Sequence, residues 1–106
     1  MSVHITKMEE LITLLNDNEN TLIVVNFFAS WCGMCKTIAP SLEELASELA
    51  ELILVLTVDV DQCKDIADEY DIWEIPTFVL VKNNEFVTQI SGANYDQLKQ
   101  VVQKNK

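Results

Sequence analysis

The sequence predicts one α/β domain over residues 1–106, built from five strands and four helices. Two runs, residues 21–29 and 52–60, are apolar at successive positions, which is typical of strands buried on both faces of a sheet. The segment between them carries apolar residues at helical spacing, so we expect a right-handed crossover that joins two parallel strands. A chain of 106 residues suits a single hydrophobic core.

The first helix is expected after a short strand near His4. Thr6 is followed three residues later by Glu9, which is a capping-box pattern. The apolar residues then recur at helical spacing, as Met8, Leu11, Ile12 and Leu15. The polar segment 16–20 should end this helix.

The second helix is expected within residues 35–51. Its apolar stripe consists of Ile38, Leu42, Leu45 and Leu49. Pro40 lacks an N–H group and clashes with the carbonyl four residues earlier, so we expect a kink there. A short third helix should follow at about residues 63–70.

The last third of the chain predicts a hairpin and a helix. Residues 76–91 alternate around Asn83 and Asn84, which tolerate the positive φ of a two-residue turn. Asn94 is the expected N-cap of the final helix, with Gln97 three residues later. The inward residues of that helix should be Leu98, Val101 and Val102.

Composition narrows the classes of function. A net charge of −10 disfavours binding to nucleic acid or to anionic membranes. The first ten residues contain no continuous apolar leader, and no run is long enough to span a bilayer. Three cysteines argue against a disulfide framework and for a reducing compartment. We therefore expect a cytoplasmic protein. We also expect it to act as a monomer.

Cys32 and Cys35 stand at the turn from the first buried strand into the second helix. Such a pair can be redox-active, half of a zinc site, or two ordinary buried cysteines. Zinc needs two more ligands, and the chain offers only Cys63 and His4, at no zinc-finger spacing. A helix N-terminus favours the thiolate, and residues three apart on a helix are neighbours. These observations favour a redox pair without a metal.

The two cysteines should have unequal roles. Cys32, expected at an exposed tip of the helix, would attack a disulfide of a partner. Cys35, expected to be more shielded, would resolve the mixed disulfide. Trp31 would shelter the site.

Several motifs together resemble the thioredoxin family, and the eukaryotic cytosolic members in particular. The motifs are "WCGMCK" (the family has WCGPCK), Pro40 in the following helix, "VDVDQCKDIADEY", "IPTF" and "SGAN". The resemblance implies a thioredoxin fold, in which a central mixed sheet is flanked by helices on both faces. It also implies a cis peptide bond before Pro76, which lies against the redox pair.

The resemblance further implies the activity and its partners. Thioredoxins exchange dithiols for disulfides with protein substrates, and an NADPH-dependent thioredoxin reductase returns the electrons. No cofactor is bound apart from the Cys32–Cys35 disulfide. A shallow substrate groove is implied at Trp31, Gly33, Ile75, Pro76 and Gly92.

Two residues depart from the family pattern. Met34 replaces a proline, which should loosen the turn and add an N–H donor near Cys32, making the protein a weaker reductant. Asn26 replaces a buried aspartate that is thought to take the proton of the resolving cysteine. Asn26 cannot exchange a proton near neutral pH, although it can hold a water. Thr57 stands on the neighbouring strand where many relatives have a charged residue.

The sequence also predicts where three further residues lie. Cys63 is expected to be a half-buried thiol, with a regulatory role as the alternative. Trp73 should either extend the partner-binding surface or pack beneath the loop before Pro76. His4 should lie on the surface.

The alternative functions are a partner-binding module with an incidental cysteine pair, and a disulfide isomerase or oxidase, although such enzymes usually have a histidine between the cysteines.

Overall fold

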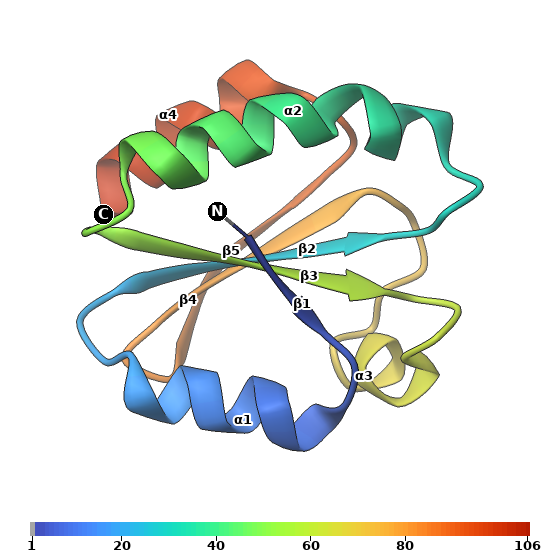
Figure 1. Ribbon diagram of the computed structural model, residues 1–106, viewed down its shortest axis with the longest axis horizontal. Helices are drawn as coiled ribbons and strands as arrows, with labels where there is room; N and C mark the ends of the chain where they lie inside the picture. The colour runs from blue at the N-terminus through green and yellow to red at the C-terminus, as the bar shows by residue number, and fades with distance from the viewer. Residues whose placement is uncertain (1) are drawn as a thin grey trace.

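The computed structural model describes residues 2–106, which form five strands and four helices (Figure 1). In chain order these elements are β1 (Ser2–Ile5), α1 (Met8–Asp17), β2 (Leu22–Phe28), α2 (Gly33–Glu48), β3 (Ile53–Asp59), α3 (Lys64–Glu69), β4 (Thr77–Lys82), β5 (Glu85–Ser91) and α4 (Tyr95–Asn105). The number and order of elements agree with the sequence prediction.

The strands form one mixed sheet in the order β1-β3-β2-β4-β5. β1, β3 and β2 are parallel, so β2, α2 and β3 form the predicted crossover. β4 is antiparallel to β2, and β5 is antiparallel to β4. The two apolar runs therefore occupy adjacent strands inside the sheet, which explains why neither alternates between apolar and polar residues.

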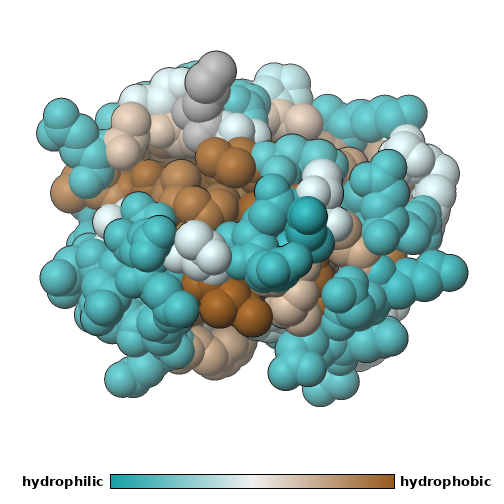
Figure 2. Space-filling model, turned by 60° about the horizontal axis from the view of Figure 1, so that its bottom comes forward, coloured by the Kyte–Doolittle hydropathy of each residue, from teal (hydrophilic) through white to brown (hydrophobic). Residues whose placement is uncertain are grey.

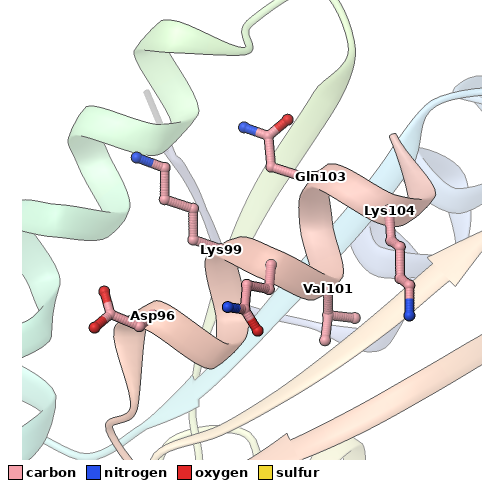
Figure 3. Close-up of a pocket in the computed structure, with 6 residues that line it drawn as sticks. Asp96, Lys99, Val101, Gln103 and Lys104 are labelled. Carbon is pink, nitrogen blue, oxygen red and sulfur yellow. The ribbon is translucent and has the colours of Figure 1, made fainter.

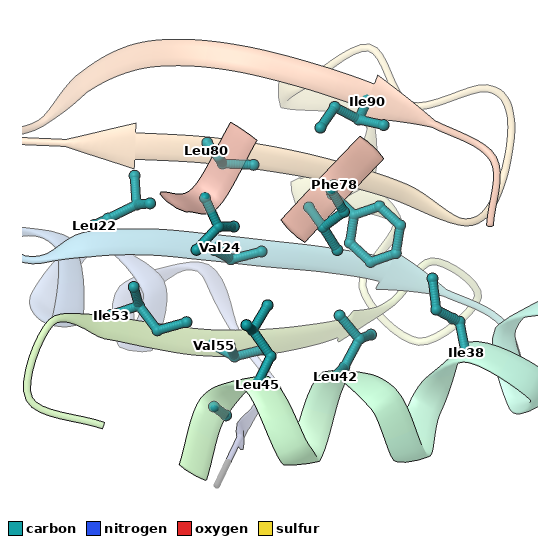
Figure 4. Close-up of a cluster of buried hydrophobic side chains, with 13 residues drawn as sticks. Leu22, Val24, Ile38, Leu42, Leu45, Ile53, Val55, Phe78, Leu80 and Ile90 are labelled. Atoms are coloured by element: carbon teal, nitrogen blue, oxygen red, sulfur yellow. The ribbon is translucent and has the colours of Figure 1, made fainter. Parts of the chain in front are cut away.

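Helices cover both faces of the sheet, with α2 and α4 on one side and α1 and α3 on the other (Figure 1). Between the sheet and α2 lies a buried cluster in which side chains from four strands meet the helix (Figure 4). Its members include Leu22, Val24, Ile38, Leu42, Leu45, Ile53, Val55, Phe78, Leu80 and Ile90. A second cluster, which includes Phe27, Leu56 and Ile66, fills the opposite face. Successive residues of β2 thus serve two cores, which fits a three-layer domain.

The local signals at the hairpin and the last helix are confirmed. Asn83 and Asn84 have φ values of 55° and 62°, as a two-residue turn of the expected type requires. The side chain of Asn94 accepts a hydrogen bond from the N–H of Gln97 at 3.0 Å. Pro40 lies inside α2 as expected, and the kink at this residue stays a prediction.

Three details of the predicted helices are wrong. The capping carboxylate of α1 is that of Glu10, not Glu9, and it accepts hydrogen bonds from the N–H groups of Thr6 and Lys7. The pKa of Glu10 is lowered first by a hydrogen bond from the Thr6 hydroxyl and then by these N–H bonds. α1 continues to Asp17 and leaves Ile12 exposed, because Ile12 lies about 100° around the helix from the buried Leu11. α2 begins at Gly33, so its first turn contains both positions between the cysteines.

The surface is mostly hydrophilic on the face shown in Figure 2, where a hydrophobic patch lies near the centre. Within residues 2–106, no helix is both long and apolar enough to cross a membrane.

Candidate active site

Cys32 and Cys35 are joined by a disulfide at the N-terminus of α2, with their Cα atoms 5.3 Å apart. Cys32 is the N-cap residue, and its Sγ accepts a hydrogen bond from the N–H of Cys35 at 3.1 Å. The carbonyl of Cys32 accepts from the N–H of Lys36. The first turn of α2 therefore presents a backbone donor to the Cys32 sulfur, where a thiolate would form on reduction.

The expected difference in exposure between the two cysteines is wrong for this oxidised state. Cys32 is 6% exposed and Cys35 is 5% exposed. Both sulfurs belong to a small buried cluster with Ala29, against which Phe28, Val60 and Ile75 pack. What distinguishes the two residues is their place on the helix, since only Cys32 is the capping residue and receives the N–H bond.

Two tryptophans lie beside the pair on the surface. Trp31 is 69% exposed, and its Nε1–H donates to Oδ2 of Asp61 at 2.8 Å. Trp73 is 86% exposed, so the alternative that it packs beneath the loop is wrong. Both rings, with Val60 and Ile75, help to line a shallow hollow of about 160 Å³. Large apolar side chains thus stand exposed next to the disulfide.

The loop before β4 has the expected cis peptide bond between Ile75 and Pro76. The carbonyl of Pro76 accepts a hydrogen bond from the N–H of Gly92 at 2.8 Å, which ties together the two loops that carry these residues. Gly92 has a φ of +93°, a conformation that residues with a Cβ rarely adopt. Gly33 has no such positive φ, and a Cβ added at either glycine would have no neighbour within 4 Å among the described residues.

Met34 is 55% exposed in the first turn of α2. The sequence predicted an extra N–H donor from Met34 near Cys32, but the donor that bonds to the Cys32 sulfur is the N–H of Cys35. Any effect of Met34 on the disulfide must therefore come mainly from the flexibility of the turn.

A pocket of about 370 Å³ runs beneath the redox pair from the surface to Cys35. It is lined by Ser2, Asn26, Phe28, Ala29, Ser30, Cys35, Lys36, Ala39, Glu43 and Thr57. Asn26 is 6% exposed, and its Oδ1 is buried without a hydrogen-bond partner among residues 2–106. The sequence singled out Asn26 and Thr57 but missed Glu43, which lies eight residues after Cys35 and so only about two turns along the same helix.

Cys63 is fully buried, so the expectation of a half-buried thiol is wrong. It is 2% exposed on the far face of the sheet, and its Sγ lies 3.7 Å from the carbonyl oxygen of Ile5. Burial raises the pKa of this thiol, and the carboxylates of Asp65, Asp59 and Glu10 raise it further. A thiol that is neutral and enclosed is a poor nucleophile.

A zinc ion at Cys32 and Cys35 would need two further ligands, for which the sequence offers only Cys63 and His4. In the structure, both of these residues make other contacts. Cys63 belongs to the cluster on the far face of the sheet, while the Nδ1 of His4 lies 3.0 Å from the Thr57 hydroxyl. Among residues 2–106, no three side chains of histidine, cysteine, aspartate or glutamate are grouped as a metal site.

A larger hollow of about 810 Å³ lies on α4 (Figure 3). All six of its lining residues come from this one helix, and Lys99 and Lys104 point in different directions. Without polar groups that converge on one point, this hollow does not compete with the cysteine pair as a site of chemistry.

The fold and the disulfide at the start of α2 define a thiol-disulfide oxidoreductase. Residues 2–104 match the sequence profile of the thioredoxin family, described as "Thioredoxin". The chain belongs to this family, and its activity is dithiol-disulfide exchange. Thioredoxins use an internal redox-active disulfide and no bound cofactor.

Individual relatives agree with this assignment over most of this chain. Thioredoxin of Ictalurus punctatus is 38% identical over 107 residues, covering 100% of both chains. Thioredoxin-T of Drosophila melanogaster is 42% identical over 87 residues, which are 82% of this chain and 55% of that longer protein. The X-ray structure of Fasciola hepatica thioredoxin has a TM-score of 0.95 and 40% identity, covering 98% of this chain and 99% of the other. The predicted family and fold are therefore confirmed.

Proposed function

We propose that this chain reduces disulfides in protein substrates, with Cys32 as the attacking nucleophile and Cys35 as the resolving thiol. The observation that supports this assignment is the N–H of Cys35 donated to the Cys32 sulfur at the start of α2. The same donor would stabilise a Cys32 thiolate after reduction, because hydrogen bonds to a charged acceptor are stronger than those to a neutral one.

The exchange proceeds in two steps. The Cys32 thiolate attacks one sulfur of the substrate disulfide, forms a new S–S bond and expels the other substrate sulfur as a thiolate, which takes up a proton. Cys35 then loses its proton, and its thiolate attacks the Cys32 sulfur. This forms the Cys32–Cys35 disulfide and releases the second substrate thiol. Two electrons pass to the substrate.

The oxidised pair must be reduced again for a second turnover. An NADPH-dependent thioredoxin reductase would supply the two electrons, as the family membership implies.

We further propose that the chain works as a monomer in the cytoplasm, without nucleic acid or membrane as a partner. Its net charge of −10 supports the absence of polyanionic partners, and its free thiol at Cys63 suits a reducing compartment. Light scattering and a fluorescent fusion would test these two points, and a stable dimer or a mitochondrial signal would contradict them.

Insulin reduction tests the function itself. Turbidity should develop when NADPH, a thioredoxin reductase, insulin and this protein are combined, and it should vanish with Cys32→Ser. No turbidity with either protein would instead support a partner-binding module whose cysteine pair is incidental.

The substrate should lie across Trp31, Ile75, Pro76 and Gly92 as an extended segment. The exposed rings of Trp31 and Trp73 support this proposal, because contiguous exposed apolar side chains usually mark a binding surface. Recognition by apolar contact would accept many sequences, as a general disulfide reductase requires.

Replacing Trp73 by alanine should raise the KM for a protein substrate about three- to tenfold, because truncating an aromatic residue in an interface typically costs about 1 kcal/mol or more. The rate with a small disulfide such as dithionitrobenzoate should not change, since that molecule reacts without covering the ring. Phe86→Ala, which truncates an exposed aromatic residue on β5, serves as the control. An unchanged KM would remove Trp73 from the substrate surface.

Replacing Met34 by proline should make the protein a stronger reductant by tens of millivolts. Proline is tolerated in the first turn of a helix, and it reduces the freedom of the dithiol loop more than that of the closed disulfide. A shift of about 30 mV corresponds to about 1.4 kcal/mol. Titration of both proteins against a glutathione buffer measures the difference, and a proline variant that is equally or less reducing would refute the argument.

A further inference from the structure

Three polar side chains form a row across the sheet beneath the active site. His4 of β1 is paired in register with Thr57 of β3, and Thr57 is paired with Asn26 of β2. Register partners in parallel strands point to the same face, about 4.8 Å apart. The neighbours two residues away, Val24 and Val55, belong to the core under α2, so the row lies on the side of the sheet that α2 covers.

The outer half of this row is already hydrogen-bonded. The Nδ1 of His4 lies 3.0 Å from the Oγ1 of Thr57, and the imidazole ring packs at 6.0 Å, centroid to centroid, from Phe28. His4 is exposed to solvent, whereas Thr57 is partly buried. The imidazole therefore connects the partly buried hydroxyl with bulk water.

The inner half of the row opens into the pocket beneath the disulfide. Asn26, Thr57 and Cys35 all line this pocket, and the buried Oδ1 of Asn26 accepts no hydrogen bond from the described residues. A volume of about 370 Å³ has room for water, and Oδ1 of Asn26 and Oγ1 of Thr57 offer polar partners for it. Water in this pocket would bridge the thiol of Cys35 and the hydroxyl of Thr57.

From this geometry we propose that His4 accepts the proton that Cys35 loses during resolution, through the Thr57 hydroxyl and pocket water. The inference rests on the proposed function, in which Cys35 attacks the mixed disulfide. His4 does not touch the reacting sulfurs. It acts through Thr57 and pocket water, and is therefore a positioning residue. Asn26, which cannot take up the proton, holds the water that starts the relay.

The proton and the electron pairs balance along this route. Cys35 gives its proton to the pocket water, which passes a proton to the oxygen of Thr57, and Thr57 gives its own hydroxyl proton to Nδ1 of His4. This direction requires the neutral imidazole tautomer that carries its proton on Nε2. The Cys35 thiolate then forms the bond to the Cys32 sulfur, and the substrate sulfur leaves with the electron pair of the broken bond. The imidazolium returns its proton to solvent.

The other charged groups of this region are less suitable acceptors. Lys36 and Glu43 come from α2, and Asp59 comes from β3. The carboxylate of Glu43 accepts hydrogen bonds from the N–H and hydroxyl of Ser2, and Oδ1 of Asp59 accepts from two backbone N–H groups of the following turn. A protonated lysine has no acceptor. His4 combines a free path to solvent with a direct bond to a pocket-lining hydroxyl.

Stopped-flow mixing of the reduced protein with dithionitrobenzoate separates attack by Cys32 from attack by Cys35. Attack by Cys32 releases one thionitrobenzoate at a rate that depends on protein concentration. Attack by Cys35 releases the second thionitrobenzoate at a rate that does not depend on protein concentration. We expect the second rate of the unmodified protein to rise with pH, because the relay needs an imidazole that is free to accept a proton.

In His4→Ala and Thr57→Val, the second rate should fall at least about tenfold at pH 7. The rise of this rate with pH should move to higher pH, because Cys35 must then lose its proton without the help of an acceptor. The first rate should not change in either variant, which would show that the fold and Cys32 are intact. Added imidazole should restore the second rate in His4→Ala but not in Thr57→Val, because the exposed site of His4 can admit it. A purely structural role for His4 would not predict this rescue.

Two controls complete the test. Val3→Ala alters the same strand on its other face and should leave both rates unchanged. Glu43→Gln should also leave the second rate unchanged. An unaltered pH profile in His4→Ala, or a loss in Glu43→Gln instead, would overturn the proposal. Failure of the proposed function is a separate result, since it would appear as absence of the first release in the unmodified protein.

Discussion

Replacing Cys35 with serine should convert this protein from a catalyst into a trap for its substrates. Cys32 would still attack, but no thiol would lie one helical turn away to release the mixed disulfide. Intramolecular reactions of well-placed groups have effective molarities of about 10⁵ M or more, and an external thiol cannot match this. Insulin reduction should therefore fall by more than about 1,000-fold.

Mass spectrometry of the trapped species provides the direct readout. After incubation with a disulfide substrate, the variant should gain the mass of one substrate thiol, attached at Cys32 and removed by dithiothreitol. Cys63→Ser should behave as the unmodified protein, because the Cys63 thiol is enclosed in the far core. Attachment at Cys63, or retained turnover, would contradict the assignment of the two roles.

The chemistry of this site could be predicted from the sequence because its signals are local. Cys32 and Cys35 lie three residues apart at a strand-to-helix turn, and that turn follows from the apolar run before it and the helical stripe after it. The hairpin at Asn83 and Asn84 and the cap at Asn94 are likewise specified by a few adjacent residues. Such features need no knowledge of how distant segments align.

The features that could not be predicted depend on register and packing between distant segments. His4 and Thr57 are 53 residues apart, and their contact exists only because β1 pairs with β3 in one particular register. The burial of Cys32 depends on Ile75 and Val60, which come from two separate loops. Trp73 could have been exposed or buried, since its sequence neighbours do not determine on which side of the loop it stands.

Replacing Asn26 by aspartate should raise the rate of the resolving step. The introduced carboxylate would stand in the pocket beside Cys35 and could take the proton through a single water, without the longer route through Thr57. We expect an increase of severalfold at pH 7, within the range of about 100-fold that a positioned base supplies. The second release of thionitrobenzoate measures it, and an unchanged rate would remove residue 26 from the proton route.

The same substitution should destabilise the protein in a way that depends on pH. Asn26 is 6% exposed, and burial without a charged partner raises the pKa of a carboxyl above its unfolded value of about 3.9. Near pH 3 the carboxyl is neutral in both states, so the variant should be nearly as stable as the parent. As the pH rises, ionisation favours the unfolded state, and the loss grows until the folded pKa is passed. We expect a loss of about 1–3 kcal/mol at pH 8, measured by urea unfolding of the oxidised proteins.

Combining Asn26→Asp with His4→Ala tests whether the two routes serve one proton. If Cys35 gives its proton either to the introduced carboxylate or to His4, the gain from Asn26→Asp should be larger in the His4→Ala background than in the unmodified protein. Groups that share one step are not additive, and the double-mutant cycle measures this coupling. Equal gains in both backgrounds would mean that His4 and residue 26 act on different steps. The tuning of this active site would then lie in the flexible turn at Met34 and not in its supply of a proton acceptor.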